Sequence, residues 1–173
     1  MIREIDGRYI ADTARILGEV HLGQRVSVWY STAIRGDVAR IEIGDESNVQ
    51  DNVTIHCDTG KPNLIGSRVT IGHNAVVHGL EVGDGTLIGM NATVLSDTRI
   101  GKDCLIAAGA VLTPGTVVPD GHVVMGTPGK IVRETNDGEK DYLSWLWERY
   151  VELSQAHVAD PAGPRFRPWA GDA

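Results

Sequence analysis

Aliphatic residues recur every six positions along most of this chain. From residue 82 onward the series has no exception: Val82, Ile88, Val94, Ile100, Ile106, Leu112, Val118 and Val124. Four residues after most of them stands a small residue: Thr86, Ala92, Thr98, Cys104, Ala110 and Thr116. An α-helix repeats its apolar residues every 3.6 positions and a simple strand every two, so a period of six indicates a parallel β-helix. Three hexapeptides then make one triangular coil.

The same frame continues toward the N-terminus with three changes of spacing. Its earlier members are Ile16, Leu22, Val28, Ile34, Ile43, Val49, Ile55, Ile65, Ile71 and Val77. The spacing departs from six at 34 to 43, 55 to 65 and 77 to 82. We label the three faces of the prism A, B and C in order from Ile16, and expect the aliphatics to fill its interior beside small corner residues. We assign residues 1–133 to this domain.

Composition narrows the function classes. The chain has 173 residues, enough for one folding unit, and 16 Lys and Arg against 23 Asp and Glu. A net charge of −7 without a basic run argues against nucleic acid or an anionic membrane as a partner. No apolar stretch has membrane-spanning length, and the charged start MIREIDGRY is unlike a signal peptide. We therefore predict a cytoplasmic protein, in which Cys57 and Cys104 are reduced structural residues.

The coils end before a helix. The segment TPGTVVPDGHVVMGTPGKIVRE carries the Pro and Gly that interrupt regular coiling. Asn136, followed three residues later by Glu139, is typical of a capped helix start, and we expect a helix within residues 134–157. Its apolar stripe, by default a packing surface, is Tyr142, Leu143, Leu146, Trp147, Tyr150 and Val151. The Pro- and Gly-rich residues 158–173 are expected to be irregular.

The register places an arginine and two histidines in one outward column. Arg35, His56 and His78 each follow an inward aliphatic of face A in successive coils, so neighbours lie about 4.8 Å apart. Two imidazoles at that spacing can supply two of the three nitrogen ligands that leave a tetrahedral metal ion one open position. A similar column on face C holds Tyr30, Asp51 and His73, with Gln50 beside Asp51. We interpret the remaining histidines, His21, His122 and His157, as ordinary surface residues.

His73 cannot join the other two histidines within one chain. It stands five residues before His78, on another face, about 16 Å of extended chain away. A symmetric neighbour can supply it. A closed ring of three identical subunits would place one metal site at each interface.

Three runs of residues carry a resemblance to a known family. IRGDVARIEIG, SNVQDNVTIHCD and IGHNAVVHG resemble the γ-class carbonic anhydrases and related ferripyochelin-binding-like hexapeptide proteins, over about residues 8 to 133. The resemblance implies an all-β fold, a left-handed parallel β-helix with a C-terminal α-helix, assembled as a homotrimer. It also implies reversible hydration of CO2 to bicarbonate by metal-bound hydroxide, with Zn²⁺ as cofactor or Fe²⁺ or Co²⁺ in its place.

The resemblance also implies a role for each site residue. The metal ligands would be His56, His78 and, across the interface, His73, while Asn48 and Gln50 would hold the hydroxide or CO2. Arg35 and Asp37 would form an ion pair in the site, and Tyr150 would approach the metal. A divalent metal lowers the pKa of bound water from 15.7 to about 7, and an amide can orient the resulting nucleophile. Two structural interpretations stay open: an interface ion pair for Arg35 and Asp37, and a plain surface role for Gln50.

The sequence departs from the family pattern in two places. Val38 follows Asp37 where the archetypal member has a glutamate, and the loop CDTGKPNLIG holds only one acid, Asp58. This shortening matches the smaller, bacterial-type branch, several of whose members show little or no CO2 hydration, so we expect low activity. The alternatives are an acyl-CoA thioesterase using the same metal site and a non-catalytic structural trimer. A hexapeptide acyltransferase is less favoured, because those enzymes usually use one catalytic histidine.

Overall fold

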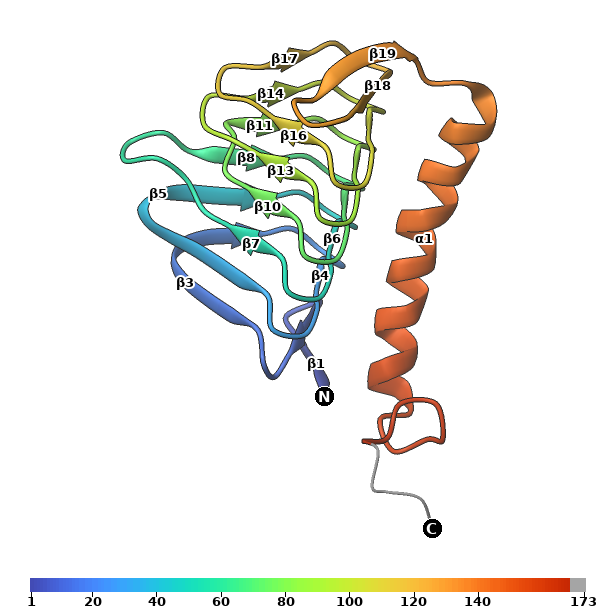
Figure 1. Cartoon of the computed structure of the whole chain (residues 1–173). Helices are drawn as coiled ribbons and strands as arrows, with labels where there is room; N and C mark the ends of the chain where they lie inside the picture. The colour runs from blue at the N-terminus through green and yellow to red at the C-terminus, as the bar shows by residue number, and fades with distance from the viewer. Residues whose placement is uncertain (169–173) are drawn as a thin grey trace.

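The computed structural model describes residues 1–168 as a triangular β-helix with one long C-terminal helix alongside it (Figure 1). The hexapeptide β-helix expected from the sequence is confirmed. Face C is formed by a nine-stranded sheet. Its strands, in spatial order, are β1 (Ile2–Ile5), β2 (Arg8–Ala11), β4 (Ser27–Val28), β6 (Asn48–Val49), β9 (Thr70–Ile71), β12 (Leu87–Ile88), β15 (Leu105–Ile106), β18 (His122–Met125) and β19 (Lys130–Glu134).

Faces A and B belong to a second sheet because two long strands, β3 (Arg15–Leu22) and β5 (Ala33–Ile43), continue from one face onto the other. Beyond β5, face A continues through β7 (Thr54–Ile55), β10 (Val76–Val77), β13 (Thr93–Val94) and β16 (Val111–Leu112). Face B continues through β8 (Asn63–Ile65), β11 (Glu81–Val82), β14 (Arg99–Ile100) and β17 (Val117–Val118). All of these pairings are parallel.

The strand register confirms the predicted column. Ile34 of β5 pairs with Ile55 of β7, which in turn pairs with Val77 of β10. The residues after them therefore stand on consecutive coils of face A. All three changes of spacing fall where face A turns into face B, so the irregular connections gather at one corner beside these residues.

The inside of the prism is a continuous apolar core. Ile34, Ile55, Val77, Ile88 and Ile106 are fully buried within it. Small residues occupy the corners as expected, and Cys104 is one of them, with its thiol near the carbonyl oxygens of Lys102 and Pro119. Cys57 is also buried, and burial raises the pKa of both thiols. The structural interpretation of both cysteines agrees with these surroundings.

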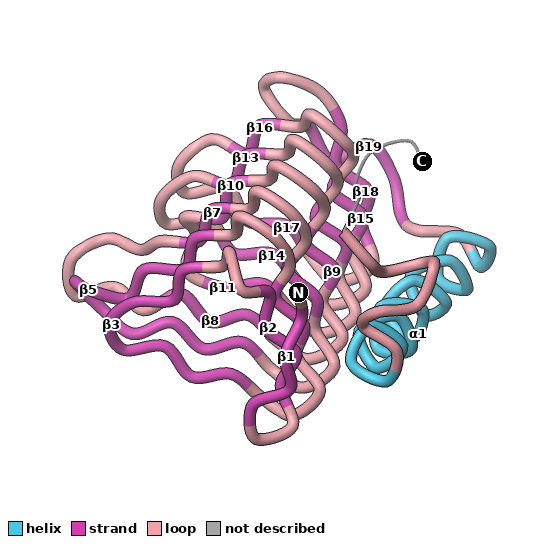
Figure 2. The backbone as a smooth tube through the Cα atoms, turned by 90° about the horizontal axis from the view of Figure 1, so that it is seen from below, coloured by secondary structure: helices cyan, strands magenta, loops and turns pink. Residues whose placement is uncertain are grey.

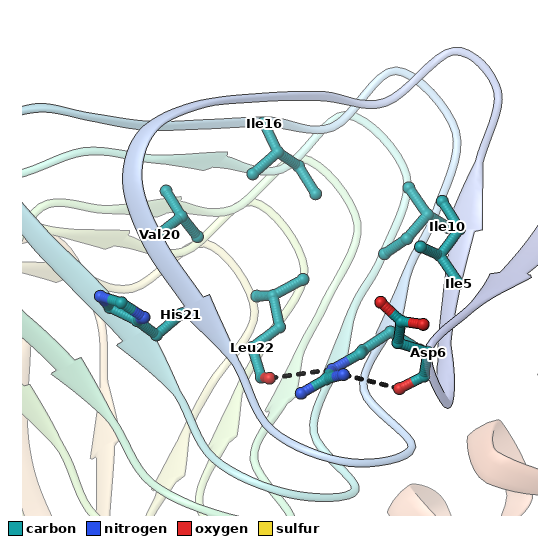
Figure 3. Close-up of a pocket in the computed structure, with 8 residues that line it drawn as sticks. Ile5, Asp6, Ile10, Ile16, Val20, His21 and Leu22 are labelled. Atoms are coloured by element: carbon teal, nitrogen blue, oxygen red, sulfur yellow. Dashed lines mark hydrogen bonds between the residues drawn. The ribbon is translucent and has the colours of Figure 1, made fainter.

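Antiparallel hairpins stand at both ends of the β-helix. β1 pairs with β2 at the N-terminal end, and β18 with β19 at the C-terminal end, where the Pro- and Gly-rich segment stops the coiling. The N-terminal end holds a hollow of about 450 Å³, into which Ile10, Ile16 and Leu22 of the first coil project (Figure 3). Arg8 also lines the hollow and donates to the carbonyl oxygens of Leu22 and Asp6.

Helix α1 (Asp137–Ala159) runs along face C (Figure 2). The Asn136 side chain accepts from the Glu139 N–H, and the Glu139 carboxylate accepts from the Asn136 N–H, which is the expected capping box. The helix ends two residues beyond the expected position, where Val158 packs against a second apolar cluster around Trp29. Residues 169–173 of the expected irregular tail lie outside the described residues. No helix within residues 1–168 has the length and apolar character needed to cross a membrane.

Candidate metal centre

His56 and His78 face each other on consecutive coils of face A. The Nδ1 atom of His56 lies 3.2 Å from the Nε2 atom of His78, and the ring centres are 5.2 Å apart. Both side chains remain about a quarter exposed, at 21% and 26%. The two imidazoles therefore form an accessible nitrogen pair at the corner between faces A and B.

Each of these histidines holds its other ring nitrogen against an oxygen atom. His56 Nε2 lies 3.0 Å from Asp37 Oδ1, and His78 Nδ1 lies 3.3 Å from Ser96 Oγ. Arg35 donates to the second oxygen of Asp37 at 2.5 Å. The Arg35 and His56 hydrogen bonds hold the pKa of Asp37 below its ordinary value, so this carboxylate stays ionised and can accept the His56 Nε2–H. Such partners fix the tautomer and ring orientation of metal-binding histidines.

The two facing nitrogens lie at hydrogen-bond distance from each other, and their spacing also fits a metal ion. Two ligands bound at about 2.05 Å with a tetrahedral angle lie roughly 3.3 Å apart. The observed 3.2 Å agrees with this value. Imidazole nitrogens are suitable donors for Zn²⁺, Fe²⁺ and Co²⁺. These residues therefore fit one half of a three-nitrogen site.

His73 belongs to a second group of residues, at the edge of face C. Its Nδ1 lies 2.9 Å from Asp51 Oδ2, which leaves Nε2 for another partner. Its backbone N–H donates to Gln50 Oε1 at 3.2 Å, and Gln50 Nε2 donates to Asn48 Oδ1 at 3.1 Å. Asn48 Nδ2 donates in turn to Thr70 Oγ1 at 2.8 Å. This chain of hydrogen bonds is buried and fixes the direction of the Gln50 amide, whose second N–H is left over.

The two groups do not meet within one chain. In the described part of the protein, no three His, Cys, Asp or Glu side chains converge closely enough to hold a metal ion. The predicted residues are thus divided into a two-histidine half (Arg35, Asp37, His56, His78) and a one-histidine half (Asn48, Gln50, His73). Every subunit carries both halves, on different sides of the prism.

Tyr150 lies beside the one-histidine half. Its ring meets Trp29 edge to face at 5.4 Å, and it shares with Gln50 the lining of an apolar groove of about 220 Å³ between α1 and face C. Gly72 and Gly89 form part of the groove floor, where an added Cβ would come within 2.8 Å of backbone nitrogen atoms. Burial, with a contribution from Asp51, raises the pKa of Tyr150 to about 12, so its hydroxyl stays neutral.

The sequence reasoning missed three partners of the site. Ser96 beside His78 and Thr70 beneath Asn48 were assigned no role, and Asp51 was placed near His73 without one. Also, Tyr142 of the helix stripe is 47% exposed at the rim of the groove instead of packed. The six-residue period could have identified Thr70, since it occupies in the next coil the position of Asn48.

Comparisons with known proteins find related sequences and structures. The family model "Bacterial transferase hexapeptide (six repeats)" matches residues 79–114. The chain is 40% identical over 162 residues to "Gamma carbonic anhydrase 1, mitochondrial" of Arabidopsis thaliana, a match that covers 90% of this chain and 59% of that protein. It is 45% identical to "Probable carbonic anhydrase" of Methanocaldococcus jannaschii, covering 84% of this chain and 92% of that protein. The chain thus spans about three fifths of the length of the plant relative and nearly all of the archaeal one.

A solved structure is also similar over most of its length. The hexapeptide transferase family protein from Anaplasma phagocytophilum superposes with a TM-score of 0.84 and 35% identity, covering 89% of this chain and 91% of that one. The similarity therefore extends beyond the repeats matched by the family model.

Proposed function

The chain belongs to the gamma carbonic anhydrase family, and we propose from this premise that it hydrates CO2 reversibly to bicarbonate at a divalent metal site shared between subunits. Relatives that are named as carbonic anhydrases, which are lyases, support this proposal. The observation that carries the proposal is the pair of facing imidazoles, each with its other nitrogen held by an oxygen. We propose Zn²⁺ as the ion, with Fe²⁺ or Co²⁺ as alternatives.

The chain's own residues supply binding and orientation. When bound, a divalent ion lowers the pKa of a water ligand to about 7 and so provides hydroxide at neutral pH. Arg35 keeps Asp37 ionised and in place, and Asp37 holds the His56 ring. The second Nε2 hydrogen of Gln50, beside His73, can donate to the oxygen on which charge develops as CO2 is attacked. Asn48 fixes the direction of that hydrogen.

The division of the site supports a homotrimer. The two-histidine half needs a third nitrogen, and the one-histidine half of an identical neighbour offers it. A heterologous contact of this kind closes after three copies if each rotates by a third of a turn. Every interface would then hold one complete site. A cytoplasmic location stays a prediction, since the names of several relatives include the word mitochondrial.

The same corner supports modest turnover. The only acid of the short loop, Asp58, lies 4.0 Å from His78 Nδ1, with its side chain 37% exposed. Val38, where the archetypal pattern has a glutamate, is also exposed. With one acid to carry protons to solvent, we expect hydration slower than in members with an acidic loop.

The groove beneath α1 supports a second candidate, hydrolysis of an acyl-CoA thioester. Its volume of about 220 Å³ equals that of about seven water molecules, far more than CO2 fills. The apolar walls suit a short acyl chain, and Gln50 at the groove would meet the carbonyl end. Hydroxide addition to that carbonyl would expel the thiolate and leave the free acid.

One experiment compares these functions with a structural trimer. Metal-replete protein is assayed for CO2 hydration by stopped flow and for hydrolysis of acetyl- to octanoyl-CoA. His56→Ala should abolish the true activity, while His21→Ala, an exposed histidine at the N-terminal end, should leave it unchanged. If CO2 hydration is lost in His56→Ala and kept in His21→Ala, the carbonic anhydrase proposal is supported. If thioester hydrolysis is lost in His56→Ala and kept in His21→Ala, the thioesterase proposal is supported. No activity in the metal-replete parent would leave a structural trimer.

A further inference from the structure

Asn63 is a polar residue buried in the apolar interior of the β-helix. It begins β8 at the corner between faces A and B and has no exposed surface. In the sheet register Asn63 is paired with Ile41, an inward aliphatic residue that is fully buried. A buried amide is unfavourable unless its polar atoms find partners. The partners that Asn63 has are therefore informative.

A single nitrogen of Asn63 connects the two coils that carry the facing histidines. Nδ2 donates to the carbonyl oxygen of His56 at 3.0 Å and to that of Val77 at 3.2 Å. Val77 directly precedes His78, and its oxygen also accepts the backbone N–H of His56. The amide thus fixes the backbone at one histidine and immediately before the other.

The corner needs such a connection because its chain lengths are irregular. In one coil Ile65 lies ten positions after Ile55, and in the next coil Val82 lies only five positions after Val77. If both connections had the regular six-residue spacing, the backbone hydrogen bonds between strands would be enough to fix the two coils relative to each other. Here the ladder is interrupted directly after each histidine, so the imidazoles depend on another constraint for their separation.

The other end of the amide gives a second observation. Asn63 Oδ1 is the one buried side-chain nitrogen or oxygen in residues 1–168 without a hydrogen-bond partner in the protein. Asn63 thus carries the free-energy cost of an unpaired buried oxygen, which a small apolar residue at this position would avoid. Among uncharged side chains, only an amide offers two hydrogens from one nitrogen, since a hydroxyl offers one.

We propose that Asn63 is a positioning residue for the metal site, which sets the separation of the His56 and His78 imidazoles through their backbone. This inference rests on the proposed metal site, although the histidine separation can be measured without metal. It assigns Asn63 no contact with the ion or the substrate. The expected consequence of its loss is weaker metal binding, with the fold retained.

The variants separate this role from a general effect of core polarity. Asn63→Asp keeps the shape of the side chain and removes both N–H donors. Asn63→Ser adds no charge and keeps at most one donor, so it replaces Asn63→Asp in the test if the Asp variant does not fold. The matched control is Thr86→Val. Thr86 is 1% exposed, donates to the Gly101 carbonyl oxygen at 2.8 Å and lies between β11 and β12, at the corner of faces B and C, away from the corner that holds the histidines.

Two readouts test the proposal. Titration of the trimer with Co²⁺ should show at least tenfold weaker binding and an altered visible spectrum in the Asn63 variants, with less than a twofold change in Thr86→Val. Crystal structures of the metal-free proteins should show the 3.2 Å separation of His56 Nδ1 and His78 Nε2 lost only in the Asn63 variants.

Failure of the proposed metal site and failure of the positioning role of Asn63 give different results. A parent protein that binds no Co²⁺ overturns the metal site, and the histidine separation in the metal-free structures then still tests Asn63. A folded Asn63 variant with parental separation, affinity and spectrum overturns the positioning role. Equal losses in Thr86→Val would also overturn it, because the effect would then belong to any buried polar group.

Discussion

Replacing Gln50 by Glu and by Ala separates two roles of its side chain. Oε1 accepts from the His73 N–H and Nε2 donates to Asn48, with Gln50 only 3% exposed. In Gln50→Glu the acceptor for His73 remains. Asn48 can turn its amide over, donating to the new carboxylate and accepting from the Thr70 hydroxyl. The network then stays paired, while the free N–H proposed to act in turnover is gone.

The structure gives different magnitudes for the two variants. Gln50→Ala leaves the His73 N–H and Asn48 Oδ1 without partners, at about 1–3 kcal/mol each. Water entering from the adjacent groove recovers part of this, so we expect a loss of about 2–4 kcal/mol. Gln50→Glu should lose about 1–2 kcal/mol, because the re-formed hydrogen bonds to the His73 N–H and to Asn48 offset most of the cost of burying a carboxylate. Turnover should fall about a hundredfold in both, as when one oxyanion donor is removed.

The assay combines urea unfolding, metal content and CO2 hydration on each variant. Gln155→Ala, an exposed glutamine on α1, is the control and should stay within about 0.5 kcal/mol of the parent with full turnover. Parental turnover in metal-replete Gln50→Glu would refute the donor role. Equal instability of the Glu and Ala variants would refute the hydrogen-bond network as described.

Three further predictions concern the helix. The pKa of Tyr150 is raised to about 12 mainly by burial, so the unfolded chain releases this proton first, near pH 10, and stability falls as the pH rises from about 10 to 12. Tyr150→Phe should flatten the alkaline limb of the stability profile measured by urea unfolding, and an unchanged slope would contradict the raised pKa. Asn136→Ala should cost about 1 kcal/mol through loss of the cap. The pKa of Glu139 is lowered to about 2 by Arg133 and the Asn136 N–H, so its contribution is complete above the unfolded pKa of about 4.3 and is lost as the pH falls toward 2. Glu139→Gln should show a shallower acid transition, and a parental one would contradict this role.

The repeat made most of the fold predictable. Because an inward aliphatic occurs once per six residues, the frame fixes which residues share a face even across changes of spacing. It placed Arg35, His56 and His78 in one column, and the register of β5, β7 and β10 agrees. The capping box was predictable for a local reason, since its two residues contact each other within one helical turn.

The finer parts of the site depend on side-chain directions at irregular corners. Ser96 reaches His78 from the next coil, and Asn63 reaches two carbonyl groups across a connection of unusual length. The period says nothing about such contacts, because they involve residues outside the repeating positions. The burial of Tyr150 against Trp29 also depends on how α1 lies on face C, which its stripe alone does not determine.

The shared site is tested most directly by mixing two inactive variants. His56→Ala and His73→Ala should each abolish tight metal binding at every site, because each complete site needs His56 and His78 of one subunit and His73 of the next. In a random mixture of equal amounts, an intact His56 meets an intact neighbouring His73 at roughly a quarter of the interfaces of a closed threefold ring. Metal content after dissociation and reassembly should therefore recover to about a quarter of the parental value, with activity following in parallel. If one chain supplied all three ligands, every chain would still lack one, and no recovery despite demonstrated subunit exchange would contradict the interfacial site.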